Sequence, residues 1–276
     1  MVILAADLIG APCWLSLAAR NREGAERFYE AVLGWEFRPG RLGRAYSVAE
    51  VGGVPVAGIG AVAAEFAVPV AWTAYFAVDD ADAAVGRVRE RGGTVGVGPV
   101  SYVAGGRAAL VADREGAVFG VWDGDMLAEW SVGSERSPAW LELRTHNAFD
   151  AALFYGEVLG WGQGGGTVGD TSYEEDQVVL RRGGRAVARL TSGPVKQAAP
   201  QPQLRPRWLV HFSVADLDTA VSAALAHGGT TVAHDPSGIE DARHTTLQDP
   251  DGGLFTIDAD HPRPGVPDTG LGTGGT

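Results

Sequence analysis

Apolar positions in the first part of the chain follow two different spacings. Residues 14–17 alternate apolar with other side chains, which is typical of a short β-strand. Residues 23–33 place apolar side chains three and four positions apart, as one face of an α-helix does. Gly34 suits the C-cap of that helix. Two strand-like runs follow, at residues 45–51 and 54–62.

The same order of elements begins again at residue 72. We predict a strand over residues 72–78 and then a helix over residues 80–91, whose first acidic residues suit the positive end of the helix dipole. A pair of glycines at 92–93 ends this helix. Further strands are predicted at residues 94–97, 108–112 and 118–122. The repeating unit is therefore a strand, a helix and then two or three strands.

The second half of the chain repeats the first. Residues 14–35 align without a gap on residues 140–161, with eleven identities in twenty-two positions. Residues 76–85 match residues 212–221 at an offset of 136 instead of 126, so the second copy carries ten additional residues between the matched blocks. We expect these residues in the loop-like stretches 162–169 or 193–207, which contain many glycines and prolines.

This repeat predicts an α+β protein of two tandem domains. We place the first domain at residues 1–130, a linker at 131–138 and the second domain at 139–260. Paired βαβββ units within each domain would form one curved, cup-shaped sheet with helices outside, and such a cup offers a pocket. Residues 261–276 are mostly Gly, Pro and Thr, which predicts a disordered tail.

Composition and charge narrow the classes of partner. The chain has 22 Lys and Arg against 34 Asp and Glu, a net charge of −12 that repels phosphate backbones and anionic lipids. We therefore expect a small-molecule ligand and neither nucleic acid nor membrane. The lone cysteine, Cys13, fits a reducing compartment, and the apolar start lacks the basic region of a secretion signal. We expect a cytoplasmic monomer or homodimer.

Three motifs, each present in both copies, carry a family resemblance. They are the FYxxVLGW block ending the first helix, the FxVDDxDAAV turn into the second helix, for which the second copy has FSVADLDTAV, and the D-x-x-G-x-x-F turn before the last strand. In this order they resemble the vicinal oxygen chelate superfamily, which includes glyoxalase I, bleomycin-resistance proteins and extradiol dioxygenases. The chain most resembles the two-domain actinobacterial members, labelled glyoxalase-like or hydroxylase. The resemblance covers residues 12–258 and implies the fold predicted above.

The resemblance also implies a divalent metal, held by His or Glu side chains that project into the cup. The six positions that correspond to the family's ligands are occupied by Trp14, Thr73, Gly120, Trp140, Leu209 and Thr256. None of these side chains is a usual metal ligand. We therefore expect no cofactor and metal-free binding, as in the bleomycin-resistance branch. A divalent metal held by displaced ligands is the alternative.

Polar residues lie two positions beyond each of these sites in the second copy. They are Glu142, His211 and Asp258, and a shift of two keeps a side chain on the same face of its strand. They are the candidate catalytic residues, as a displaced metal site or as an acid–base pair in which Glu142 or Asp258 orients His211. Chance placement of polar residues is the alternative.

Aromatic residues dominate the predicted ligand-binding set. Trp14 and Trp140 should point into the cups, and Trp72 and Trp208 should lie at the cup mouths, while core packing is the alternative for each. Indole walls favour a flat hydrophobic guest, at about 0.5–1.5 kcal/mol per aromatic pair beyond the area buried. The predicted ligand-binding residues are Trp14, Trp140, Trp72, Trp208, Tyr75 and His211.

A local basic cluster follows the enlarged loop of the second copy. It contains Arg181, Arg182, Arg185 and Arg189. These side chains could meet an anionic group of a substrate, or could form salt bridges with the acidic run at residues 174–176.

The function predicted from the sequence is metal-free binding of a small aromatic or hydrophobic metabolite, such as an antibiotic or a biosynthetic intermediate. One alternative is an enzyme: a metal-dependent lyase or dioxygenase that uses non-standard residues in the second cup, or a metal-free isomerase that uses His211. The other is a structural protein whose cups are filled.

Overall fold

The computed structural model describes most of both copies. It covers residues 8–43, 45–65, 67–102, 105–126, 130, 132, 139–162, 170–174, 177–182, 184–197, 199, 201, 204–232 and 244–259. Within these residues, no helix has the length and apolar character needed to span a membrane. The predicted tail and all of the predicted linker except Val132 lie outside the described residues. Val132 itself is buried among core residues.

The two halves of the chain have the same order of elements. The first contains β1 (Pro12–Ala18), α1 (Arg22–Leu33), β2 (Glu36–Pro39), β3 (Tyr46–Val51), β4 (Val54–Gly60), β5 (Ala71–Ala77), α2 (Ala81–Glu90), β6 (Thr94–Ser101), β7 (Arg107–Ala112) and β8 (Val118–Asp123). The second contains β9 (Ala139–Thr145), α3 (Ala148–Leu159), β10 (Asp170–Glu174), β11 (Gln177–Arg182), β12 (Arg185–Ser192), β13 (Arg207–Val214), α4 (Leu217–Ala226), β14 (Thr230–Thr231), β15 (His244–Gln248) and β16 (Leu254–Ala259).

Local sequence signals account for the helices of both copies. The side chain of Asn21 accepts a hydrogen bond from the backbone of Gly24 at the start of α1, and Asn147 caps α3 in the same way. Both helices end on a glycine in the left-handed conformation, Gly34 with φ of 67° and Gly160 with φ of 82°. Because cap residues of this kind recur at the same place, the helix limits could be predicted closely.

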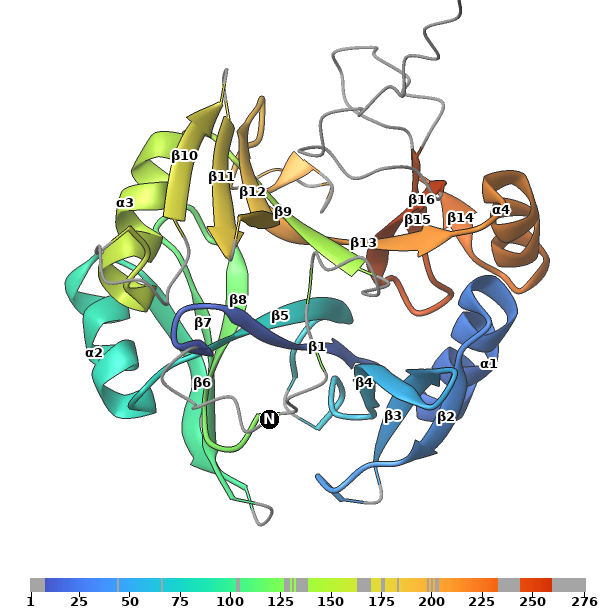
Figure 1. Cartoon of the computed structure of the whole chain (residues 1–276). Coiled ribbons are helices and arrows are strands. Elements are labelled where there is room, and N and C mark those ends of the chain that lie inside the picture. The colour runs from blue at the N-terminus through green and yellow to red at the C-terminus, as the bar shows by residue number, and fades with distance from the viewer. Residues whose placement is uncertain are drawn as a thin grey trace, which may run out of the picture.

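Each copy forms one eight-stranded sheet, which confirms the predicted fold class. The strand order is β2-β3-β4-β1-β5-β8-β7-β6 in the first sheet and β10-β11-β12-β9-β13-β16-β15-β14 in the second. In both, an antiparallel central pair joins the two βαβββ units, and each central strand is flanked by a parallel neighbour. Both sheets are open and curved (Figure 1).

Strand register shows where the additional residues of the second copy lie. Leu17 pairs with Ile59 in the first sheet, and its counterpart Leu143 pairs with Leu190 in the second. The offset between copies is therefore 131 at β4 and β12, midway between 126 and 136. Five of the ten additional residues precede β12, and five lie between β12 and β13.

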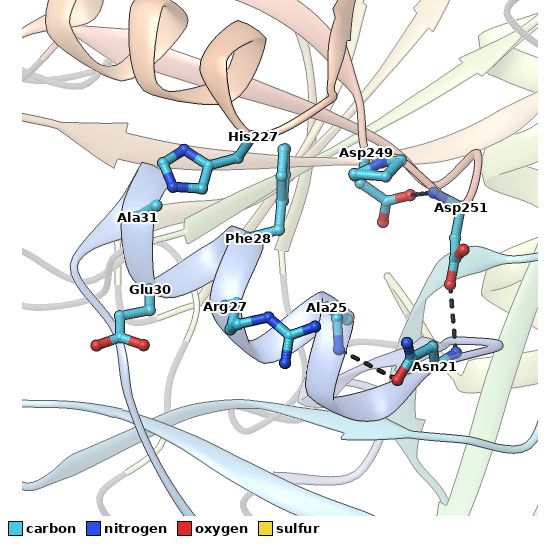
Figure 2. Close-up of a pocket in the computed structure, with 11 residues that line it drawn as sticks. Asn21, Ala25, Arg27, Phe28, Glu30, Ala31, His227, Asp249 and Asp251 are labelled. Atoms are coloured by element: carbon cyan, nitrogen blue, oxygen red, sulfur yellow. Dashed lines mark hydrogen bonds between the residues drawn. The ribbon is translucent and has the colours of Figure 1, made fainter.

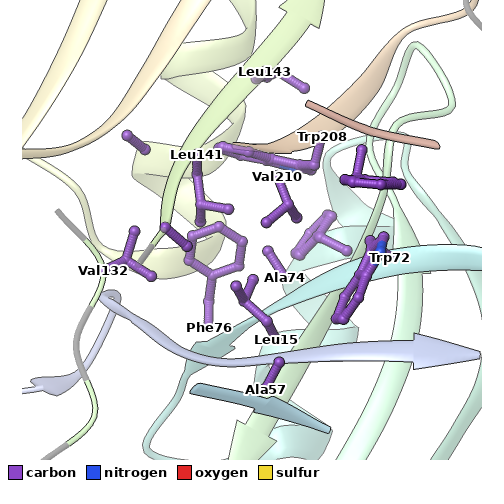
Figure 3. Packing of buried hydrophobic residues seen from close by; sticks show 14 of the residues in the cluster. Leu15, Ala57, Trp72, Ala74, Phe76, Val132, Leu141, Leu143, Trp208 and Val210 are labelled. Atoms are coloured by element: carbon purple, nitrogen blue, oxygen red, sulfur yellow. The ribbon is translucent and has the colours of Figure 1, made fainter. Parts of the chain in front are cut away.

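The two sheets lie back to back and share one hydrophobic core (Figure 1). Leu15, Trp72 and Phe76 from the first sheet meet Leu141 and Trp208 from the second (Figure 3). Helix α1 packs beside α4, and α2 packs beside α3, at the two flanks of this core (Figure 1). The concave faces therefore point away from each other, and we call them the first cup (β1–β8) and the second cup (β9–β16).

Two matching hydrogen-bonded chains cross between the domains. The indole of Trp208 donates to the Tyr155 hydroxyl at 2.9 Å, and this hydroxyl donates to Asp113 of the first domain at 3.0 Å. The repeat produces an equivalent second chain of hydrogen bonds, in which Trp72 donates to Tyr29 and Tyr29 donates to Asp249 of the second domain. Each buried polar group of these two chains thus has a hydrogen-bond partner, as buried polar groups generally do.

Candidate ligand-binding site in the second cup

Three neighbouring strands bring Glu142, His211 and Asp258 together. Strand β13 lies between β9 and β16, and the ring of His211 lies between the two carboxylates. Its Nε2 is 3.3 Å from a carboxylate oxygen of Glu142, and its Nδ1 is 3.2 Å from one of Asp258. His211 is 3 % exposed, so this pairing takes place away from bulk water.

The same cluster fixes the orientation of Trp140. The indole stacks on the His211 ring with centroids 3.8 Å apart and an interplanar angle of 26°. Its Nε1 donates to Asp258 at 2.6 Å. Asp258 therefore has hydrogen-bond contacts with both stacked rings, and Trp140 is held in one position while part of its surface remains exposed.

Charges around His211 favour its protonated form. Burial alone would raise the pKa of Glu142, but the hydrogen bond and charge of His211, together with Arg144 at 2.9 Å and a hydrogen bond from Thr191, lower it to about 2. Burial alone would lower the pKa of His211, but the hydrogen bonds and charges of Asp258 and Glu142 raise it above its usual 6.5. The two flanking carboxyl groups therefore favour the protonated ring of His211.

This cluster predicts a pH-dependent contribution of His211 to stability. A raised histidine pKa adds stability that is complete below about pH 6.5 and is lost as the pH rises through the folded value, whereas the lowered pKa of Glu142 adds stability that is lost below about pH 4.5. Replacing His211→Gln should therefore lower the free energy of unfolding more at about pH 5.5 than at about pH 9. Urea denaturation of both proteins at the two pH values measures this, and an equal loss at both would contradict it.

The described donors of the second cup do not fit a divalent metal. The two nitrogens of His211 diverge toward separate carboxylates, so the three side chains do not converge on one point. The positions inherited from the family's ligands carry Trp140, Leu209 and Thr256. Among the described residues, no group of three or more His, Cys, Asp and Glu side chains has a geometry that could hold a metal ion.

We expect a metal chelator to leave the protein unchanged. Dialysis against EDTA should alter neither its melting temperature nor its affinity for an aromatic ligand, because the described donors hold one another. Elemental analysis of the purified protein should find well below one transition-metal ion per chain. Near one ion per chain, lost on mutating Glu142→Ala or His211→Ala, would instead support the displaced metal site.

The first cup carries one serine and two aromatic side chains where the second carries ionisable groups. Ser16, Tyr75 and Trp122 replace Glu142, His211 and Asp258 (compared position by position through the repeat). The Tyr46 ring lies across the floor of this cup, where its hydroxyl accepts a hydrogen bond from Trp14 at 2.7 Å. A Cβ at Gly58 would lie 1.8 Å from that hydroxyl, so the glycine makes room for it. The first cup thus contains a phenol of the protein itself above Gly58, a feature that the sequence pattern did not indicate.

The other predicted residues lie in the shared core, in the first cup or in the second cup. Trp72 and Trp208 are each 5 % exposed and face the shared core, not the cup mouths, so core packing accounts for them. Trp14 and Tyr75 are partly exposed in the first cup.

The predicted basic cluster has two described side chains with different contacts. Arg181 forms an ion pair with Glu174, as the salt-bridge alternative expected, whereas Arg189 lies over the Trp140 ring. The side chains of Arg182 and Arg185 are outside the described set.

A groove of about 590 Å³ lies apart from both cups, between α1 and the ends of α4 and β15 (Figure 2). Two of its three acidic residues have structural partners: Asp249 accepts from Tyr29, and Asp251 accepts from the backbone of Asn21 (Figure 2). At the related position between α2 and α3, Arg91 pairs with Glu157, and their counterparts beside the groove are His227 and Ala31. The groove therefore reflects smaller side chains at a domain contact.

The structure defines a class of proteins with two tandem domains of paired βαβββ units, each with one cup-shaped sheet. Residues 14–121 match the family model of the Glyoxalase/Bleomycin resistance protein/Dioxygenase superfamily, and residues 140–257 match that of the Glyoxalase-like domain. The chain belongs to this superfamily.

Relatives with known names cover almost the whole chain. "Anthracycline biosynthesis protein DnrV" of Streptomyces peucetius is 32 % identical, over 90 % of this chain and 92 % of the relative. "Putative glyoxylase CFP32" of Mycobacterium tuberculosis is 30 % identical, over 90 % of this chain and 94 % of the relative. Among solved structures, the Mn(II)-bound glyoxalase of Novosphingobium aromaticivorans is 17 % identical, with a TM-score of 0.52 over 97 % of this chain and 92 % of that one. This structural likeness concerns the fold alone.

Proposed function

We propose that the second cup binds a flat aromatic metabolite without a metal. The observation that carries the proposal is the partly exposed indole of Trp140, held in place by His211 and Asp258 inside a concave sheet. A rigid aromatic surface with a few convergent polar groups is typical of a small-molecule site. Stacking on such a surface favours a planar guest over a flexible one.

The contrast between the cups supports one working site per chain. Tyr46 occupies the first cup, and strand register gives Gln177 as its counterpart in the second, because Tyr46 pairs with Gly60 where Gln177 pairs with Thr191. No aromatic plug of this kind is therefore contributed by β11. We therefore place the proposed site in the second cup.

The similarity to anthracycline biosynthesis proteins suggests the size of the guest. Anthracyclines contain fused, planar rings, and a protein that acts in their biosynthesis meets such rings as intermediates. We therefore propose a polycyclic aromatic intermediate of antibiotic biosynthesis as the ligand class. The protein would sequester it or present it to another enzyme.

Acid–base catalysis is the second candidate, because of the imidazolium at His211. A buried histidine between two carboxylates is a possible proton donor to an oxygen of a bound guest. To reach a guest, one of its nitrogens would have to leave its carboxylate partner. A chemical change of the bound probe, seen by NMR and lost in His211→Ala, would establish this role.

Titration calorimetry with anthraquinone-2-carboxylate tests the proposed function. We expect about one molecule bound per chain, in the presence and in the absence of EDTA. Two equivalent sites per chain would contradict the assignment of the first cup as filled. No binding of this probe, of its neutral carboxamide or of quinizarin would overturn the proposal itself and leave the structural alternative.

A further inference from the structure

One guanidinium in the second cup lies next to the proposed stacking surface. Arg189 is on β12, where it pairs in register with Glu142 of β9. Its guanidinium carbon is 5.9 Å from the centroid of the Trp140 ring, within cation–π range. Strand β9 lies between β12 and β13, so Arg189 and His211 are on the two strands that flank the strand of Trp140. A guest on the Arg189 side would touch both the indole and this cation.

Arg189 differs from its charged neighbours in its partners. Arg144 is paired with Glu142 at 2.9 Å, and Arg181 is paired with Glu174 at 2.7 Å. Among the described residues, no carboxylate forms an ion pair with Arg189. The side chain is half-buried, and this burial lowers its pKa even though Glu142 and Glu174 act in the opposite direction. A partly desolvated cation without a paired anion gains most from an anionic partner that arrives with a ligand.

The first copy forms the same fold without arginines at the corresponding positions. The counterparts of Arg189, Arg144 and Arg207 in the first copy are Gly58, Ala18 and Ala71. All three arginines lie on the cup face of their strands, opposite the residues that enter the shared core. Three cations on one concave face stand out in a chain of net charge −12. Arg144 has a structural role as the ion-pair partner of Glu142, whereas Arg189 forms no ion pair with a described carboxylate.

We propose that the ligand of the second cup is an aromatic acid, whose anionic oxygen binds Arg189 while its ring lies against Trp140. This inference rests on the proposed function and specifies its ligand class. A planar guanidinium presents paired N–H donors that match a carboxylate. At the equivalent position of the first cup, Gly58 has no side chain and the Tyr46 hydroxyl fills the space.

A pair of probes that differ in one group tests the inference. Anthraquinone-2-carboxylate and anthraquinone-2-carboxamide share the same rings and differ in charge. We expect the native protein to bind the carboxylate about tenfold or more tightly than the amide, since a charge-assisted hydrogen bond is the stronger one. Equal affinity would overturn the inference and leave the proposed function standing. Failure of both probes and of quinizarin to bind would overturn the proposed function.

Three variants assign the preference to Arg189. Arg189→Gln should remove most of the preference for the carboxylate and keep the affinity for the amide, whereas Arg189→Lys should retain part of the preference. Arg38→Gln is the matched control, because it removes the same charge from an exposed ion pair with Glu50 in the first domain; its preference should equal that of the native protein. A carboxylate preference that survives intact in Arg189→Gln would overturn the role given to Arg189.

Discussion

Replacing Trp208→Ala should lower the free energy of unfolding by about 3–5 kcal/mol. The indole is 5 % exposed and lies between the domains, with its ring centroid 5.2 Å from that of Phe76 and 5.4 Å from that of Tyr155. Its loss would leave a cavity and would also remove the donor to the Tyr155 hydroxyl. A loss of this size is a large part of the about 5–15 kcal/mol that stabilises a typical domain.

Guanidinium denaturation followed by circular dichroism measures this effect. Trp72→Ala should lower the free energy of unfolding by about as much, because Trp72 makes the equivalent contacts with Tyr29 and Phe212 at the corresponding position of the first copy. Phe149→Ala is the control: this ring is 52 % exposed on α3, so its removal should change the stability little. A cost below about 1 kcal/mol for Trp208→Ala would contradict a shared core that depends on this residue.

The internal repeat explains why so much of the fold could be predicted. Identical residues in the two copies fix the same caps, turns and strands twice, as Asn21 and Asn147 do at the helix starts. Some identities had a further cause that the sequence did not reveal. The two copies share a tyrosine, Tyr29 and Tyr155, and an aspartate, Asp113 and Asp249. Each of these side chains forms a hydrogen bond across the domain contact. Such contacts depend on how two sheets meet, which no local pattern encodes.

Strand alternation allowed part of the candidate site to be predicted from the sequence. The side-chain packing around it could not be predicted in this way. The face shared by Glu142, His211 and Asp258 followed from a period of two, and the structure brings the three together. The same rule could not say that Trp208 faces a second sheet instead of a cup mouth, because an apolar residue suits either side. Nor could it show that Tyr46 crosses a glycine floor at Gly58, since that depends on the curvature of the sheet. Residues that differ between the copies, Arg189 and Gly58 among them, locate the proposed site.

Replacing Trp140→Ala should weaken the binding of anthraquinone-2-carboxylate by about 2 kcal/mol or more, the scale of a binding hot spot, which is about a 30-fold higher Kd. The indole supplies the proposed stacking surface, and the cation of Arg189 would remain without it. Trp140→Phe keeps an aromatic ring but loses the donor to Asp258, so it should retain part of the affinity. Titration calorimetry on the three proteins gives the comparison.

The repeat supplies a matched control for this prediction. Trp14 is the counterpart of Trp140, and its indole donates to Tyr46 inside the filled first cup. Trp14→Ala should therefore leave the affinity unchanged, although it removes the same side chain from the same strand position. His211→Ala should cost less than Trp140→Ala, because His211 supports the indole from the side away from Arg189. A larger effect of Trp14→Ala than of Trp140→Ala would move the site to the first cup, since the two variants differ in the cup that they alter.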